Sequence, residues 1–98
     1  MNVALHHKNA QTIVAICDDE LCGKTFTEGD LILDLSSPFY QGVSMDERAA
    51  GDILRNAHIV NLVGERSCAL ARKEEIITEK NISRICNVPF AFATIVRD

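Results

Sequence analysis

Aromatic and basic residues are both scarce in this sequence of 98 residues. It contains no tryptophan and one tyrosine, and aromatic residues make up 5% of the chain. Such a low content argues against an exposed platform on which nucleic-acid bases stack. Ten Lys and Arg residues stand against 14 Asp and Glu residues, which gives a formal net charge of −4. Because phosphate backbones are bound mainly by cationic side chains, this balance argues against autonomous RNA binding and predicts no DNA partner.

Long apolar runs are also missing. A membrane-spanning helix needs roughly 20 predominantly apolar residues, and every uncharged run in the chain is far shorter. The first eight residues lack the apolar segment of a secretory signal peptide. We therefore expect a cytoplasmic protein with no membrane partner. The apolar content of 47% suffices for one compact core, so residues 1–98 are expected to form a single domain.

No metal-binding pattern stands out among the thiols and imidazoles. The four cysteines are Cys17, Cys22, Cys68 and Cys86. The Cys17-x4-Cys22 spacing is too wide for a zinc knuckle, and no second closely spaced pair accompanies it. His6 and His7 are adjacent on a predicted strand, so their side chains would point to opposite faces. The sequence predicts reduced, buried or partly buried thiols, with no metal and no cofactor.

The hydrophobic pattern predicts a mixed fold. Apolar and alternating runs predict strands over residues 3–7, 12–17, 31–35, 59–63, 82–86 and 90–96. Helical spacing predicts helices over residues 45–56 and 65–73, the first begun by a capping box of Ser44 and Glu47, and residues 27–30 are expected to form a turn. The order β-β-β-α-β-α-β-β predicts an α/β (α+β) fold, in which two helices pack on a mixed β-sheet.

The last predicted strand is apolar on both faces. Thr94 is the one polar residue among positions 90–96. Such a strand must be covered on both faces, either by a central position in the sheet or by a partner at a dimer interface. We expect the central position, because the last two strands can be inserted between earlier ones. A homodimer is the alternative.

The turn after the strand over residues 59–63 is the first candidate binding site. An apolar, β-branched run stops there at a glycine and continues into a helix-favouring segment. Such a turn directs free backbone N–H groups toward one point, where a carboxylate or phosphate can bind. The candidate ligand-binding residues are Asn61, Gly64, Glu65 and Arg66. In the alternative interpretation Gly64 only forms the turn, Glu65 interacts favourably with the helix dipole, and Arg66 is solvated.

The acidic turn before Gly23-Lys24-Thr25 does not form a nucleotide-binding loop. A phosphate-binding loop needs a glycine five positions before Gly23, and that position holds Asp18. Asp18, Asp19 and Glu20 could act as acid–base groups or bind a divalent cation, although an acidic turn that caps a helix and is solvated is more common. Because no nucleophile, base and orienting group can be identified, the sequence predicts no enzyme activity.

Several blocks of the chain resemble a family of small archaeal proteins, the "domain of unknown function 424" family. The blocks are Ala15-Ile16-Cys17-Asp18-Asp19-Glu20-Leu21-Cys22-Gly23-Lys24-Thr25-Phe26, Glu28-Gly29-Asp30-Leu31-Ile32-Leu33-Asp34-Leu35, Phe39-Tyr40-x-Gly42, Ala57-x-Ile59-x-Asn61-Leu62-Val63-Gly64-Glu65-Arg66, Asn81-Ile82-x-Arg84-Ile85 and Val88-Pro89. The resemblance covers nearly the whole chain. It implies an archaeal, cytoplasmic, single-domain protein with no established enzyme activity and with a link to the translation machinery or RNA.

This chain departs from the family pattern at two places. The pattern has Leu where this chain has Cys22, which favours a packing role over a metal role for that thiol. After Val-Pro the pattern has His-Ala-Gln, where this chain has Phe90-Ala91-Phe92, so no role of that His can be transferred.

From these observations we expect a non-catalytic binding or adaptor module. Its expected partner is a ribosomal or RNA-associated protein, since a protein surface avoids the objection that the net charge raises against RNA. The candidate partner-binding residues are Asp18, Asp19, Glu20, Lys24, Phe39 and Tyr40. The alternative is a small anionic-ligand-binding protein or minor enzyme with its site at Gly64-Glu65-Arg66.

Overall fold

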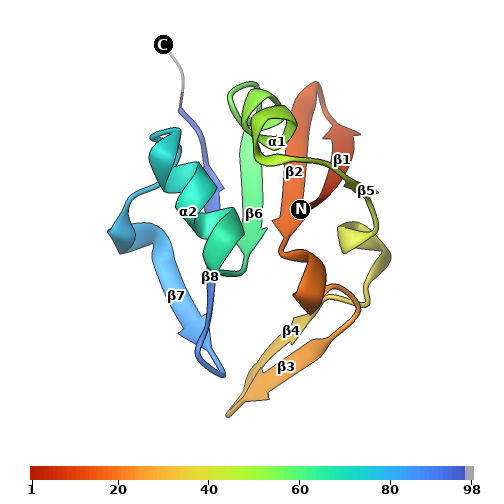
Figure 1. Ribbon diagram of the computed structural model, residues 1–98, viewed down its shortest axis with the longest axis vertical. Helices are drawn as coiled ribbons and strands as arrows, with labels where there is room; N and C mark the ends of the chain where they lie inside the picture. Colours follow the sequence, from red (N-terminus) through yellow and green to blue (C-terminus); the bar gives the residue numbers. More distant parts are fainter. Residues whose placement is uncertain (97–98) are drawn as a thin grey trace.

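Six strands form one mixed sheet, in the order β5-β1-β2-β6-β8-β7, in a computed structural model that describes residues 1–96 (Figure 1). These strands are β1 (Asn2–Lys8), β2 (Gln11–Cys17), β5 (Val43–Ser44), β6 (Ile59–Val63), β7 (Ile82–Ile85) and β8 (Val88–Thr94). A separate hairpin pairs β3 (Thr25–Glu28) with β4 (Leu31–Asp34). The helices are α1 (Glu47–Leu54) and α2 (Glu65–Lys73), and three short 3₁₀ turns are η1 (Asp19–Leu21), η2 (Pro38–Tyr40) and η3 (Glu79–Asn81). The predicted mixed sheet with two helices is confirmed.

The β3–β4 hairpin replaces the broader turn that the sequence predicted over residues 27–30. Its reversal is confined to Gly29 and Asp30, because Glu28 already pairs with Leu31. Gly29 has φ +60°, which glycine adopts without steric cost. In β3 the side chain of Phe26 is half-buried and the others are exposed. The alternation that marks a strand in sequence is therefore weak in this segment.

Helix α1 begins later than its capping pattern predicted. Asp46 is the N-cap residue, and its side chain accepts a hydrogen bond from the Ala49 amide at 2.9 Å. Ser44, the predicted cap, instead pairs with Asn2 in β5. Both residues are suitable caps, and the pairing of β5 with β1 decides between them. Helix α2 has the predicted bounds.

Strand β8 lies inside the sheet, between β6 and β7. It is antiparallel to both neighbours, so β6 and β7 run parallel to each other. The expected central position of the last strand is thus confirmed. The expectation that both of its faces are covered is wrong at Phe92, whose side chain is 52% exposed.

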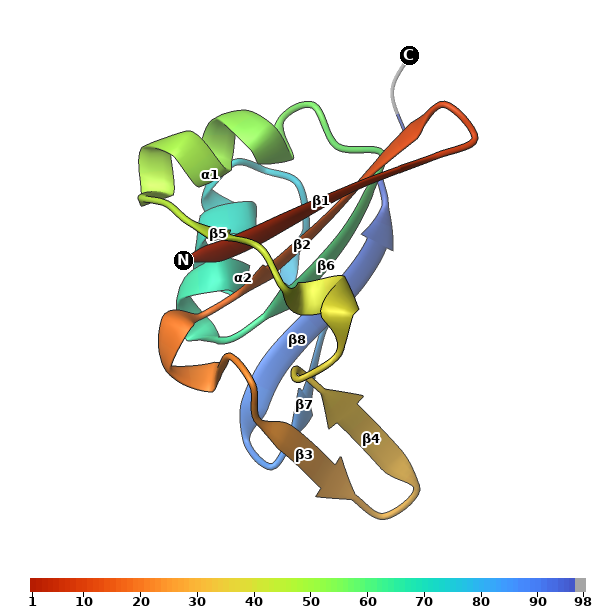
Figure 2. The same ribbon diagram turned by 90° about the vertical axis from the view of Figure 1, so that its right-hand side faces the viewer.

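Both helices pack on one face of the sheet, and the β3–β4 hairpin and η2 lie on the other (Figure 2). The core under the helices includes Val14, Ile16, Leu54, Val60, Leu62 and Ala71. The core on the other face includes Ala15, Cys17, Leu33, Leu35, Tyr40, Val63 and Ile85. Since the hairpin and η2 cover only part of that face, the two faces of the sheet are not equally closed.

Candidate functional site

The carboxyl ends of β2 and β6 lie side by side because these two strands are parallel. Cys17 is opposite Val63, and the Asp18 amide donates to the Val63 carbonyl at 3.0 Å. Asp18 follows β2 and Gly64 follows β6, so the acidic turn and the start of α2 meet at one edge of the sheet. The acidic turn at Asp18 and the turn at Gly64, which were predicted as separate candidate sites, are therefore neighbours.

Asp18 caps helix α2. Its carboxylate accepts hydrogen bonds from the amides of Arg66 and Ser67 at 3.0 and 2.8 Å, and from the Ser67 hydroxyl at 2.7 Å. The side chain is almost completely buried, with 2% of Asp18 exposed. A carboxylate at a helix N-terminus is stabilised by the free amides and by the helix dipole. Asp18 therefore supplies an internal anion at the place where the sequence predicted an external one.

Gly64 allows this close approach. A Cβ atom at this position would lie 2.2 Å from the Asp18 Cγ atom, and its φ of +112° is rarely adopted by other residues. The interpretation of Gly64 as a turn-forming residue is thus confirmed, but its turn holds a side chain of the same protein. An outside anion would have to displace Asp18 to reach the amides of Arg66 and Ser67.

Asn61 and Arg66 do not line a common pocket. Asn61 is paired with Ala15 and Phe92, and this row faces away from the helices. Arg66 lies on α2, on the other face of the sheet. The predicted ligand cluster is therefore divided by the sheet itself.

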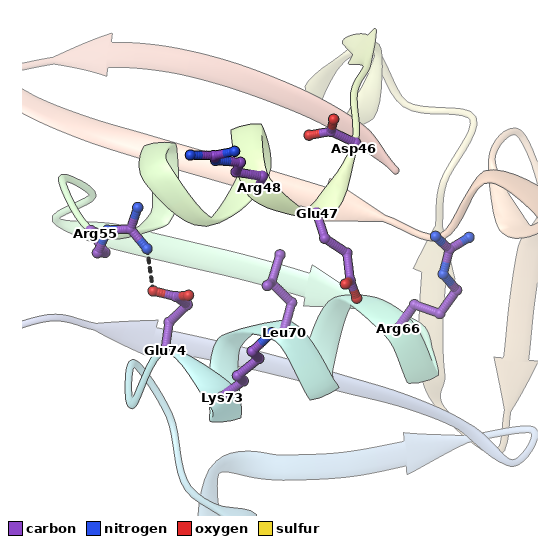
Figure 3. A pocket seen from close by; sticks show the side chains of 8 residues that line it. All are labelled: Asp46, Glu47, Arg48, Arg55, Arg66, Leu70, Lys73 and Glu74. Carbon is purple, nitrogen blue, oxygen red and sulfur yellow. Dashed lines mark hydrogen bonds and ion pairs between the residues drawn. The ribbon is translucent and has the colours of Figure 1, made fainter.

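Arg66 lines a groove of about 590 Å³ between α1 and α2 (Figure 3). The groove is lined by Asp46, Glu47, Arg48, Arg55, Arg66, Leu70, Lys73 and Glu74. Glu47 extends from α1 toward α2, whereas Arg48 extends away from the groove floor. Within residues 1–96 the side chains of Arg48, Arg66 and Lys73 form no ion pair. The groove thus offers cationic side chains, but they alternate with carboxylates.

The predicted partner-binding residues fall into two groups. Asp19 and Glu20 are exposed on η1, and Asp19 accepts from the α-amino group of Met1 at 3.1 Å. Phe39 and Tyr40 lie in η2, and Phe39 stacks on His6 with ring centroids 4.7 Å apart. Tyr40 is buried, which raises the pKa of its hydroxyl.

The remaining predicted contact residues differ in access. Lys24 is exposed, and Asp18 is buried beneath α2. Phe39 and Lys24 therefore present side-chain surface to a partner, whereas Asp18 and Tyr40 act within the core.

The bare part of the sheet around Phe92 was not predicted from the sequence. In this row Phe92 is exposed and its β6 neighbour Asn61 is partly buried, and Ile13 and Ile59, which are adjacent in the next row, are also partly buried. None of these side chains belongs to the core under the helices. The apolar character of residues 90–96 was the available signal, but it was interpreted as complete burial.

Residues 1–96 contain neither a metal-binding cluster nor a membrane-spanning helix. No group of three or more His, Cys, Asp or Glu side chains is arranged so that it could hold a metal ion. In the same part of the chain, neither helix has the length and apolar character needed to cross a membrane.

Comparison with known proteins places the fold in a family. The sequence model of the family described as "Protein of unknown function (DUF424)" matches residues 6–96. A crystal structure of an uncharacterised conserved protein from Methanopyrus kandleri is similar, with a TM-score of 0.84 and 24% sequence identity. The alignment covers 99% of this chain and 93% of that chain. A search of curated proteins found no match.

Proposed function

The chain belongs to the DUF424 family of proteins of unknown function, and from its own surface we propose that it is a non-catalytic binding module. In this proposal the bare part of the sheet around Phe92 docks onto a protein of the translation machinery. The family resemblance supports the translation context. The exposure of Phe92 on an internal strand is the observation that carries the docking site.

Large apolar side chains on internal strands are normally covered. Phe92 pairs with Asn61 of β6, whereas the β8–β7 ladder ends one residue earlier at Ala91, and half of the Phe92 surface is exposed. Phe90 lies beside it, with ring centroids 5.3 Å apart. Partly exposed aromatic side chains held on a rigid sheet lose little conformational entropy on binding, and aromatic anchors dominate many protein interfaces.

The charge of this face favours a protein partner over RNA. The strand positions that point away from the helices and are at least partly exposed are Asn2, His6, Lys8, Gln11, Ile13, Ser44, Ile59, Asn61, Ser83, Val88, Phe90, Phe92 and Thr94. None of these is Asp or Glu, and Lys8 is the one Lys or Arg among them. Strand positions with a single cation neutralise few phosphates, whereas a sparsely charged surface with accessible Phe90 and Phe92 fits the depleted charge and the aromatic content of a protein interface core.

Co-sedimentation with ribosomal particles tests the proposal. Tagged full-length protein is added to a native lysate at low salt, and the fraction that pellets with the particles is measured. The Phe92→Ser variant should reduce this fraction about tenfold, which corresponds to roughly 1.4 kcal/mol lost at one anchor. The matched control is Leu5→Ser, because Leu5 is 47% exposed on β1 and faces the helix side.

Three results would contradict the proposal. A protein that stays wholly in the supernatant argues against a ribosomal partner, and equal losses for Phe92→Ser and Leu5→Ser argue against this face. Binding to purified ribosomal RNA with a steep salt dependence would instead make RNA the partner. Analytical ultracentrifugation of the pure protein detects the alternative homodimer, which Phe92→Ser would then dissociate.

The groove between α1 and α2 supports a second candidate, a small anionic ligand. The side chains of Arg66 and Lys73, which form no ion pair with the described residues 1–96, border it. Guanidinium groups bind phosphate or carboxylate in a bidentate manner. The ligand would be held by these side chains, since Asp18 occupies the turn amides. The predicted contribution of Gly64 and Glu65 would then be structural.

Titration calorimetry with inorganic phosphate tests this candidate. Binding to the wild type should weaken about tenfold or more in Arg66→Gln, and Arg84→Gln serves as the control because Arg84 already pairs with Glu65 outside the groove. Absence of heat in the wild type at millimolar phosphate, or equal weakening in both variants, would argue against the groove as an anion site.

A further inference from the structure

Two cysteine sulfurs meet where β2 ends. The Sγ atoms of Cys17 and Cys22 are 2.9 Å apart, compared with about 2.05 Å in a disulfide. Both cysteines are free thiols. We propose that Cys17 and Cys22 form a reversible intramolecular disulfide on exposure to a peroxide, which makes residues 17–22 an oxidant-responsive modification site.

The two thiols differ in access to an oxidant. Cys22 is exposed at the end of η1, whereas Cys17 is fully buried at the end of β2. Burial raises the pKa of the Cys17 thiol to about 12, and its hydrogen bond with Cys22 adds to this rise. Cys17 therefore stays protonated and shielded, and Cys22 is the thiol that a peroxide reaches first.

The reaction balances with hydrogen peroxide as the oxidant. The Cys22 thiol releases its proton to solvent, and the thiolate attacks one peroxide oxygen. The O–O bond breaks, and the hydroxide that leaves takes up a proton from solvent, so that Cys22 sulfenic acid and water result. The Cys17 sulfur then attacks the Cys22 sulfur, the S–S bond forms and the S–O bond breaks, and the Cys17 proton leaves with the hydroxide as a second water. Two thiols lose two electrons in total, and the peroxide gains them.

The backbone of the turn holds the two sulfurs in place for this step. The Leu21 amide donates to the Asp18 carbonyl at 2.9 Å, and the Cys22 amide donates to the Asp19 carbonyl at 3.3 Å. The Cys22 thiol also donates to the Asp18 carbonyl at 3.5 Å. Two reacting groups held this close react as a unimolecular pair, so the buried Cys17 can resolve the sulfenic acid before a second oxidant molecule arrives.

The other two cysteines lack such an arrangement. Cys68 is buried under the helices. Cys86 is exposed like Cys22, but its thiol donates to the Thr27 carbonyl at 3.1 Å and no second sulfur is within hydrogen-bonding distance in the described chain. Cys86 is therefore a matched control for an exposed thiol without a partner.

Intact-protein mass spectrometry of the full chain tests the proposal. The wild type, treated with about one equivalent of hydrogen peroxide, should lose the mass of two hydrogen atoms, and dithiothreitol should restore it. Peptide mapping without reduction should link Cys17 to Cys22. The Cys22→Leu variant, which carries the residue of the family pattern, should not lose this mass, and Cys86→Ser should behave like the wild type.

A trapping experiment identifies the first thiol oxidised. In Cys17→Ala, dimedone should label Cys22 as a sulfenic acid, and the label should be several-fold weaker in the wild type. The proposal is overturned if the wild type shows no two-hydrogen loss, if the loss requires Cys86, or if Cys22 accumulates as a higher oxide with Cys17 still reduced. Cys22→Leu changes an exposed side chain, so we expect this variant to fold. Its mass measurement therefore still tests the proposal if Cys17→Ala does not fold.

Discussion

The two faces of the six-stranded sheet are built by the same strands but are closed to different extents. On the helix side, α1 and α2 bury Val14, Ile16, Val60 and Leu62 completely. On the other side, the short β3–β4 hairpin and η2 cover Val63 and Ile85 but leave Phe92 half exposed. The difference shows that the covering elements, rather than the strands, decide which apolar side chains belong to the core. We infer that the helix side mainly stabilises the fold and the other side is free to bind.

Replacement of Ile95 by Asp gives the largest expected effect. Ile95 packs against the core under the helices and its amide donates to the His58 carbonyl at 2.7 Å. A carboxylate placed there is poorly hydrated and unpaired, so the free energy of unfolding should fall by on the order of 3 kcal/mol or more. Urea unfolding followed by circular dichroism measures this loss. A folded Ile95→Asp variant that differs only in its oligomeric state would show that the strand is an interface.

Replacement of Asp18 by Asn should have the next largest effect. The amide group of Asn cannot accept all the bonds that the carboxylate receives from Arg66 and Ser67, and it removes the charge that favours the helix start. We expect a loss of about 2–3 kcal/mol in the free energy of unfolding. Glu20→Gln is the matched control, because Glu20 lies on the same acidic turn and its exposed side chain should contribute little. Equal losses in the two variants would contradict the capping role of Asp18.

The buried thiol on the helix side predicts a loss of stability in alkali. Burial raises the pKa of Cys68 from 9.0 to about 12. Between these values the unfolded chain releases the proton and the folded protein keeps it, so stability is fully present below pH 9.0 and is lost as pH rises toward 12. Under reducing conditions, Cys68→Ala should make the free energy of unfolding fall less steeply with pH in this range. The difference in slope should correspond to about one proton fewer released on unfolding. An unchanged slope would mean that Cys68 is not protected from ionisation.

The smallest expected effect on stability is at Phe92. Since the Phe92 side chain is half exposed, Phe92→Ser should change the free energy of unfolding by less than about 0.5 kcal/mol. Thermal unfolding of this variant, compared with Ile95→Asp, directly contrasts the two faces. A large loss at Phe92 would indicate that the bare face contributes to the core, and the docking proposal would lose its basis.

Local patterns accounted for much of the fold. The alternating and apolar runs located all strands of the main sheet except β5, and α2 was predicted with its observed bounds. The prediction failed where two local signals competed, as at Ser44 and Asp46 in front of α1, because pairing with a distant strand made the choice. It also missed β3, in which three of the four side chains are exposed.

The candidate site was less accessible to sequence reasoning. The Gly64 turn was correctly identified, but the anion that it accommodates is Asp18, a residue 48 positions before Arg66. Asn61 and Arg66, only five positions apart, lie on opposite sides of the sheet. Spacing along the chain indicates neither the contact of Asp18 with the start of α2 nor the separation of Asn61 from Arg66. Both arrangements depend on which strands are paired and on the face of the sheet on which each helix packs.

The sequence by itself determined the elements and their turns, since hydrophobic period, glycine position and cap residues act within a few residues of each other. Tertiary structure alone decided that the parallel pairing of β2 with β6 places Asp18 under α2 and that Cys17 and Cys22 face each other. It also decided that β8 is internal yet bare at Phe92. The physical reason is that burial and long-range hydrogen bonds depend on what packs against a residue, and that partner is distant in the chain.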